Sequence, residues 1–226
     1  MSEEEKKEPI PVQYAMRAVY EQLDEVAAKA LKTIPVSCGK GCDDCCKLLC
    51  CCTFAEALLI ADTLLRREND EWEKFWLPKL RAAAIEADFP EISNGSYFTK
   101  KVSCVFLKDR ECGIYDIRPA ACRLHYVTTP REQCSPDAPK VQVQAPDFRQ
   151  LEQLVWNVSR QILEESFDGN MDLLAGPLAL MVLAVSLILL KNDPHQADVL
   201  QACKGLLTPA KWMQRMISNK VKRAAQ

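Results

Sequence analysis

Residues 38–46 read CGKGCDDCC, and residues 104–123 read CVFLKDRECGIYDIRPAACR. The two stretches contribute these thiols: Cys38, Cys42, Cys45, Cys46, Cys104, Cys112 and Cys122. Two thiolates separated by two residues can converge on one metal ion about 2.3 Å away, so this spacing recurs in zinc and iron-sulfur sites. Adjacent Cys45 and Cys46 project in different directions, which makes them poor partners on one tetrahedral ion. We therefore predict that the two stretches complete each other in a cysteine-thiolate site that organises the fold.

The composition is that of an ordinary globular protein. Apolar residues make up 48% and charged residues 27% of the 226 residues, and the net charge of -2 gives no reason to expect a nucleic-acid partner. Residues 1–8 form a mixed-charge run with no apolar secretion signal after it, so we expect a cytoplasmic protein. In a reducing cytosol, 12 cysteines indicate metal binding or redox chemistry; an exported, disulfide-bonded protein is the alternative.

Hydrophobic periodicity predicts several helices. One covers residues 12–34, with apolar residues on one face at Met16, Val19, Tyr20, Leu23 and Val26. Thr53 and Glu56 form a capping-box pattern that should start a second helix. A third covers residues 70–87, with a break near Leu77 because Pro78 lies inside it. Helical spacing returns at about Pro146, and further helices are predicted over residues 151–163, 197–207 and from 209 onward.

Residues 89–144 lack a helical period and are rich in turn formers. Val102–Leu107 and Gly113–Tyr115 are predicted to pair as a small hairpin across Lys108–Glu111, holding the second cysteine cluster. The expected fold class is mainly α, with an irregular cysteine-rich metal-binding region and its hairpin packed on a helical core. We expect a disordered tail, an N-terminal helix, a metal-binding region and a C-terminal helical region packed as one unit, over residues 1–11, 12–36, 37–135 and 146–226.

One apolar segment raises the question of a membrane helix. Leu173–Leu190 is 18 residues long and carries no charge, which is the threshold length for a span. Pro177 favours the first position of a helix, so the helix itself should run only from Leu178 to about Lys191. We therefore predict a buried core helix and no membrane partner.

The cysteine pattern resembles the YkgJ-like family, also called CxxCxxCC, which is described as a zinc- or iron-chelating domain and sometimes as iron-sulfur-containing. The resemblance covers Cys38–Arg123 and implies that the seven cysteines of the two stretches are metal ligands. Tyr115, Arg118 and Pro119 fill the family's Tyr-x-x-Arg-Pro signature. The first gap in this chain is three residues instead of two, which makes Cys38 the least secure of the implied ligands.

Other residues carry two interpretations each. Cys134 is either an eighth ligand, which would allow two four-thiolate sites, or a free loop thiol. Cys50–Cys52 are expected to be small buried hydrophobes, with metal ligands as the alternative, and Cys203 is expected to be a core residue. His125 could reach the metal if its stretch is helical, and otherwise has a capping or surface role. Arg118, the candidate cofactor-binding residue, could donate hydrogen bonds to the thiolates and offset their negative charge, or pair with a nearby carboxylate.

The predicted function is metal-ion binding through an iron-sulfur or zinc site, with a structural, metal-handling or electron-transfer role. Ligands that are all cysteine favour iron-sulfur, although zinc obeys the same rule. The alternative is an iron-sulfur enzyme, an oxidoreductase or a protein lysine methylase, because flagellin lysine N-methylases share the cysteine pattern. Against an enzyme, the chain has no Gly-rich nucleotide loop and only two histidines. We expect the chain between the clusters to fold only with metal.

Overall fold

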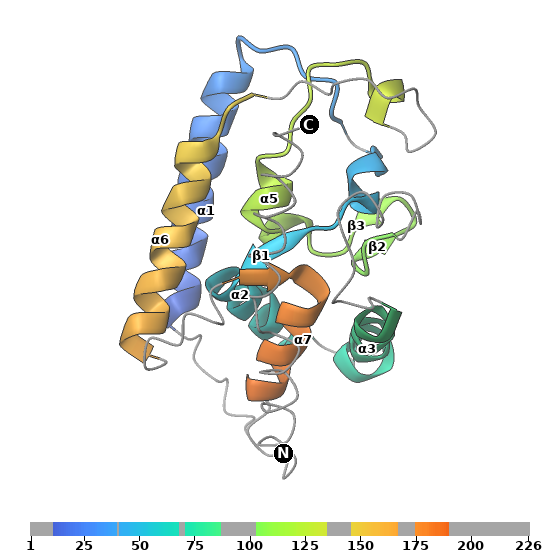
Figure 1. Ribbon diagram of the computed structural model, residues 1–226, viewed down its shortest axis with the longest axis vertical. Coiled ribbons are helices and arrows are strands. Elements are labelled where there is room, and N and C mark those ends of the chain that lie inside the picture. Colours follow the sequence, from blue (N-terminus) through green and yellow to red (C-terminus); the bar gives the residue numbers. More distant parts are fainter. Residues whose placement is uncertain are drawn as a thin grey trace, which may run out of the picture.

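A computed structural model describes residues 11–39, 41–67, 71–86, 103–134, 146–166 and 175–189. These residues form a mainly α protein, as predicted, with two small two-stranded sheets (Figure 1). The predicted helices from residue 197 onward and Cys203 lie outside the described residues. The predicted tail also lies outside them, except for Pro11.

The first helix, α1, runs from Pro11 to Leu31, close to the predicted 12–34. Four of the five residues predicted to face the core are buried. Val26 is the exception, because its side chain is 45% exposed and Ala27 takes the next buried position. The helix ends four residues before Pro35, so the proline does not itself terminate it.

The capping box at Thr53 is confirmed. Helix α2, Phe54–Leu65, begins directly after Thr53, whose hydroxyl accepts the N–H of Glu56 while the Glu56 carboxylate accepts the N–H of Thr53. Almost every side chain of α2 is buried, and α2 packs against α1, α6 (Arg149–Ser166) and α7 (Leu178–Leu189). Helix α2 is therefore the centre of the core rather than an amphipathic surface helix.

The predicted break before Pro78 takes the form of a π-helical turn. Residues Trp72–Trp76 form this turn, η2, and α3 follows from Leu77 to Glu86. The N–H of Leu77 reaches back to the carbonyl oxygen of Trp72, five residues earlier, and Pro78 has no N–H to continue the regular ladder. The buried indole rings of Trp72 and Trp76 then face the core.

Helix α6 lies alongside α1, as Figure 1 shows. It begins close to the predicted position, and Val155 and Ser159 on its inner face are fully buried. The hydroxyl of Ser159 accepts the N–H of Ala55 at 3.0 Å, which satisfies one of the free amides at the start of α2.

Strand β1, Cys51–Thr53, pairs antiparallel with β4, Ala175–Pro177, and α7 starts at the next residue, as predicted from Pro177. The N–H of Leu178 donates to the carbonyl oxygen of Cys50 at 3.0 Å. This sheet was not predicted from the sequence. Within the part of the chain that the structure describes, no helix has the length and apolar character needed to cross a membrane.

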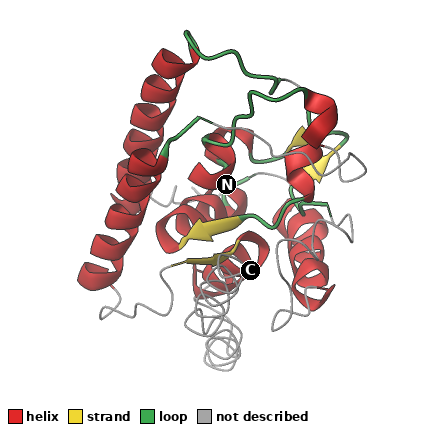
Figure 2. Cartoon of the chain, turned by 45° about the horizontal axis from the view of Figure 1, so that its top comes forward, coloured by secondary structure: helices red, strands yellow, loops and turns green. Residues whose placement is uncertain are grey.

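The predicted hairpin exists, but its strands are shorter and shifted. Strand β2 is Leu107–Lys108 and β3 is Glu111–Cys112, so Lys108 and Glu111 form a ladder pair instead of lying in the turn. Asp109 and Arg110, with φ of 50° and 65°, form the two-residue turn, which is typical of tight hairpins. Short helical segments complete this region: η1 Asp44–Lys47, η3 Tyr115–Ile117, α5 Ala120–Arg123 and η4 Arg131–Cys134 (Figure 2).

Candidate metal centre

The two cysteine-containing segments lie side by side. The N–H of Cys104 donates to the carbonyl oxygen of Cys46 at 2.7 Å, and the N–H of Ser37 donates to that of Val127 at 2.8 Å. These bonds hold both ends of the first cysteine loop against residues 103–127. The two clusters therefore meet through their backbones, and a metal shared between them stays a prediction.

The first loop is wound tightly enough to gather its thiols. Gly41 has a φ of +76°, a conformation that costs little only for glycine. The N–H of Cys42 then donates to the Gly39 carbonyl oxygen, and that of Cys46 to the Asp43 carbonyl oxygen. Cys45 is exposed, and a hydrogen bond with the Cys46 thiol lowers the pKa of Cys45 to about 7.

We define an inner thiol group by its five members, Cys46, Cys50, Cys104, Cys112 and Cys122. The sulfurs of Cys50 and Cys122 are 3.2 Å apart. Two ligands of one tetrahedral ion with bonds of about 2.3 Å lie about 3.8 Å apart, so this pair already approaches ligand spacing. Burial, together with the charges of Cys122 and Cys112, raises the pKa of Cys104 to about 12, which places these thiols within electrostatic reach of one another.

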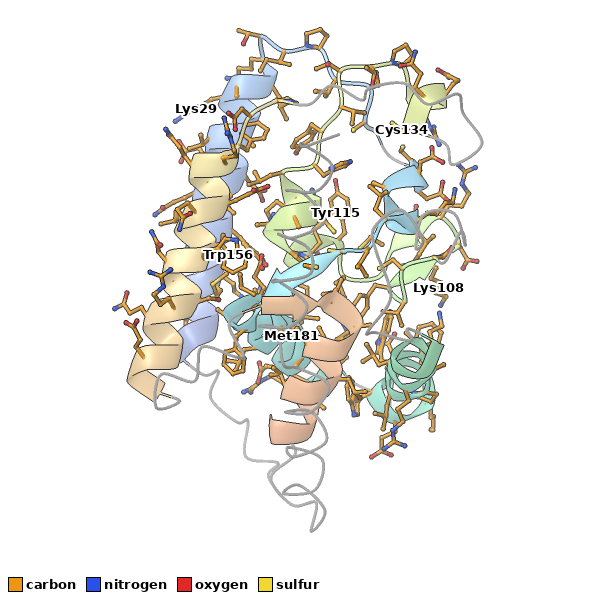
Figure 3. The ribbon with its side chains drawn as sticks, in the orientation of Figure 1. Lys29, Lys108, Tyr115, Cys134, Trp156 and Met181 are labelled. Atoms are coloured by element: carbon orange, nitrogen blue, oxygen red, sulfur yellow. The ribbon has the colours of Figure 1, made fainter. Side chains whose placement is uncertain are left out.

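We define an outer thiol group as Cys38, Cys42, Cys45 and Cys134. The sulfur of Cys38 accepts the N–H of Val127 at 3.3 Å. Burial raises the pKa of Cys134, and the charges of the other three thiols add to the rise. Figure 3 places Cys134 on η4, at the same end of the molecule as the loop that carries the first cluster.

Cys122 is positioned by two buried anchors on the short helix α5. The N–H of Ala120 donates to the Glu56 carboxylate at 2.6 Å, and the Glu56 side chain is 2% exposed. Arg123 is equally buried, forms an ion pair with Asp24 of α1, and stacks over the ring of Tyr20 at 4.2 Å. The Tyr20 hydroxyl donates to Glu56 in turn. The core helices α1 and α2 therefore hold the backbone on both sides of Cys122.

The positive charge of Arg118 influences the pKa values of two thiols, Cys112 and Cys45. Its guanidinium donates to the carbonyl oxygen of Tyr115 at 2.9 Å and stacks on the Tyr115 ring at 3.7 Å. Burial raises the pKa of Cys112, and the positive charge of Arg118 opposes that rise. The same charge contributes to the lowered pKa of Cys45. Of the two predicted roles, this arrangement fits the offsetting of thiolate charge.

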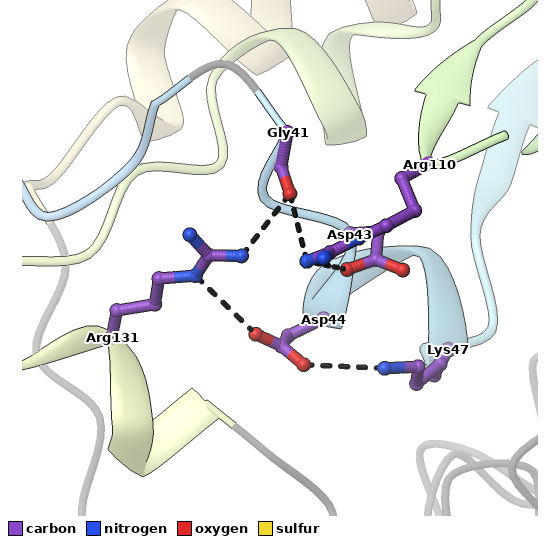
Figure 4. Close-up of polar contacts among 6 residues, drawn as sticks. All are labelled: Gly41, Asp43, Asp44, Lys47, Arg110 and Arg131. Atoms are coloured by element: carbon purple, nitrogen blue, oxygen red, sulfur yellow. Dashed lines mark hydrogen bonds and ion pairs between the residues drawn. The ribbon is translucent and has the colours of Figure 1, made fainter.

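Two further arginines hold the first loop from opposite sides, as Figure 4 shows. Arg110, in the hairpin turn, and Arg131, in η4, each donate to the carbonyl oxygen of Gly41 at 3.1 Å. Arg110 also pairs with Asp43, and Arg131 pairs with Asp44. The hairpin and η4 are thus both tied to the loop that presents Cys42 and Cys45.

The thiols are near one another without yet surrounding a common point. Among the residues that the structure describes, no three His, Cys, Asp or Glu side chains are arranged closely enough to hold a metal ion as they stand. Thiolates that lie together repel one another, and a cation removes this penalty. The donor set, thiols with no carboxylate among them, is the one that zinc and iron-sulfur clusters select. A metal would therefore have to draw the side chains inward.

The predictions for Cys50, Cys52 and His125 have different outcomes. Cys52 is buried in the core, as expected, whereas Cys50 is half-buried and lies beside Cys122. Sequence reasoning missed Cys50 because only the long-range packing of β1 against α5 reveals its neighbour. Helix α5 ends at Arg123, so His125 does not share a helix with Cys122, which was the condition for its predicted role. The His125 carbonyl oxygen instead accepts a contact from the Cys38 thiol at 3.9 Å.

A groove of about 690 Å³ lies between α1 and the start of α6, away from the cysteines. Its lining contains no cysteine and no histidine, and includes Val26, Ala30, Phe148 and Leu151. This groove therefore does not supply the open metal position beside a pocket that a metal-dependent enzyme would need.

The Cys50–Cys122 contact leads to a prediction for the reduced, metal-free protein. Diamide should join these two sulfurs first, because their thiols lose two hydrogens to the diamide N=N bond and the new S–S bond needs little movement. Peptide mapping by mass spectrometry should recover the Cys50–Cys122 crosslink as the main product. Cys50→Ser should abolish it, whereas Cys51→Ser should not; a dominant crosslink elsewhere would contradict the geometry.

The comparisons with known proteins agree with the cysteine pattern. Residues 37–138 match the family model CxxCxxCC, described as "Putative zinc- or iron-chelating domain". No curated protein and no solved structure matches the chain. The match spans both cysteine segments, the hairpin, α5 and η4. It confirms the resemblance seen in the sequence: residues 37–138 of this chain are similar to the CxxCxxCC family.

Proposed function

We propose that this chain is a metal-binding protein in which a cysteine-thiolate site, iron-sulfur or zinc, joins the two cysteine clusters. The observation that carries the proposal is the inner thiol group. Its members come from the first loop, the approach to β1, the hairpin and α5, and lie within electrostatic reach of one another. Segments so distant in sequence have no packing reason to bring five thiols together.

The surroundings support a resident metal rather than a catalytic thiol. The members of the inner group are half-buried, and burial raises the pKa of Cys104 and of Cys112. A buried thiol of raised pKa is inert until a cation ionises it. Arg118, the residue predicted to serve a bound cofactor, offsets thiolate charge at Cys112. The described cysteines are all free, which supports a reducing compartment, the cytoplasm.

The first experiment is metal analysis together with a visible absorption spectrum on protein purified without oxygen. Stoichiometric iron with sulfide and a brown chromophore would assign an iron-sulfur centre and an electron-transfer role. Colourless protein with stoichiometric zinc would assign a structural or metal-handling role. The absence of both metals would overturn the proposal.

Ligand substitution provides the second test. Cys104→Ser and Cys112→Ser should each weaken metal binding by more than about 100-fold, beyond what loss of an outer-shell partner costs. Cys51→Ser is the matched control: Cys51 is a half-buried cysteine of strand β1, and of the inner thiols only Cys122 contributes to its raised pKa. Affinity is measured by competition with a chromophoric chelator. Equal affinities for all three variants would contradict the assigned ligands.

A further inference from the structure

We infer that the chain holds two separate thiolate metal sites, and that the outer thiol group, Cys38, Cys42, Cys45 and Cys134, forms the second. The inference rests on the proposed function, which places the first metal at the inner thiol group. Four thiolates without another donor type fit tetrahedral zinc or a single iron ion.

The backbone first brings Cys38 to the right place. The N–H of Ser37 donates to the carbonyl oxygen of Val127, and the N–H of Val127 donates to the sulfur of Cys38. The two segments thus run together at this point. An N–H donated to a sulfur stabilises its thiolate form, so this contact suits a metal ligand.

Cys134 then faces the same loop because of the geometry of η4. In a 3-10 helix, side chains three residues apart lie on the same face, and Arg131 and Cys134 are three residues apart. Arg131 points at the first loop, where it donates to the Gly41 carbonyl oxygen and pairs with Asp44 (Figure 4). The Cys134 thiol is therefore directed toward the thiols of that loop, and the influence of Cys38, Cys42 and Cys45 on its pKa agrees with this placement.

The adjacent pair Cys45 and Cys46 divides between the two sites. Their thiols are hydrogen-bonded to each other where the two groups meet, and the structure leaves Cys45 exposed while Cys46 is half-buried. The charges of Cys104 and Cys112 contribute to the raised pKa of Cys46. The charge of Cys45 contributes to the raised pKa values of Cys38 and Cys134, and also to that of the inner thiol Cys46. Cys45 thus stands between the groups, and assigning it outward gives the outer site four thiols. The inner site then keeps Cys46, Cys104, Cys112 and Cys122 as its four ligands, with Cys50 beside Cys122.

Two arginines hold the loop of the outer site in place. The guanidinium groups of Arg110 and Arg131 both donate to the carbonyl oxygen of Gly41, which is the residue just before Cys42. Because Arg110 also pairs with Asp43 and Arg131 with Asp44, the two side chains fix the position of the loop that presents Cys42 and Cys45.

The test counts zinc in the full chain. Reduced, metal-free protein is loaded with zinc alone, unbound zinc is removed, and zinc per chain is measured by elemental analysis. Wild type and Cys51→Ser should hold two ions, Cys134→Ser one, Cys104→Ser one, and the Cys104→Ser, Cys134→Ser double variant none. The ion retained by each single variant, together with its far-ultraviolet circular dichroism, shows that the variant is folded.

Other counts separate the two proposals. One zinc ion in wild type that survives Cys134→Ser but not Cys104→Ser would overturn the second site and leave the proposed function standing. No zinc in wild type would overturn both. Loss of both ions in Cys134→Ser, or two ions retained, would overturn the assignment of Cys134 to a separate site.

Arg131 supplies a check that leaves every thiol in place. Arg131→Gln should weaken only the second zinc ion, by about 10-fold or more, because it releases η4 from the first loop. Arg149→Gln is the control, since Arg149 is an exposed arginine paired with Asp147, far from the cysteines in sequence and lining the groove. Equal stepwise affinities for both variants would overturn the role of Arg131.

Discussion

Chelation of the bound metal should unfold residues 37–50 and 103–134 while α2 and α7 stay folded. Regular hydrogen bonding in this region is sparse, since β2 and β3 contribute two residues each and α5 only four. Binding of a structural zinc ion is worth about 10–16 kcal/mol in small metal domains, so loss of the metal removes most of what orders these segments. Hydrogen exchange with mass spectrometry, with and without chelator, would measure the loss of protection segment by segment.

The control uses the selectivity of thiolates. Zinc added back should restore protection, whereas magnesium should not, because magnesium prefers oxygen ligands. Metal-free protein that melts cooperatively at the same temperature as the loaded protein would contradict this prediction and would show that the cysteine region folds without metal.

Glu56→Ala should lower the free energy of unfolding by about 3–5 kcal/mol, because it leaves several buried donors without an acceptor. The carboxylate accepts the N–H of Thr53 at 2.8 Å, the Thr53 hydroxyl at 3.0 Å, the Tyr20 hydroxyl at 3.1 Å and the N–H of Ala120 at 2.6 Å. Urea unfolding measures the change. Metal affinity should fall as well, since Ala120 lies two residues before Cys122.

Glu25→Ala is the matched control, because Glu25 lies on the surface of α1 and pairs with exposed Lys29. Its unfolding midpoint should equal that of the wild type. An unchanged midpoint for Glu56→Ala would instead show that Glu56 does not hold α5 to the core.

The pH dependence of stability follows from the same side chain. Burial raises the pKa of Glu56 above its ordinary value of 4.5, so the folded state holds the proton more tightly than the unfolded state does. The stability that this proton adds is fully present below the pKa of Glu56 in the unfolded state. It is lost as the pH rises through the pKa of Glu56 in the folded state. Glu56→Gln should remove that part of the slope of stability against pH.

Local signals in the sequence predicted much of the fold. The capping box at Thr53, the break before Pro78 and the start of α7 after Pro177 depend on nearest neighbours along the chain, and the structure confirms each of them. The hairpin was placed too wide because the favourable turn, Asp109 and Arg110, consists of residues that are not the usual glycine or asparagine pair.

Long-range contacts could not be predicted from one sequence. The pairing of β1 with β4 and the position of Cys50 beside Cys122 depend on how distant helices pack, and no local pattern encodes them. The division of the cysteines into inner and outer groups has the same origin. The spacing shows which residue types can bind a metal, whereas the turn at Gly41 and the contacts of Arg131 determine which of them face one another.

The pairing of Cys51 with Pro177 also affects how the chain is made. During synthesis on the ribosome, β1 and the apolar surface of α2 emerge long before β4 and α7, their main partners. Closing so large a loop is slow, since the entropy of the intervening chain is lost before any contact rewards it. Until then, the nascent chain presents an unpaired strand edge and apolar side chains to the solvent, so its interval of greatest aggregation risk ends only when α7 docks.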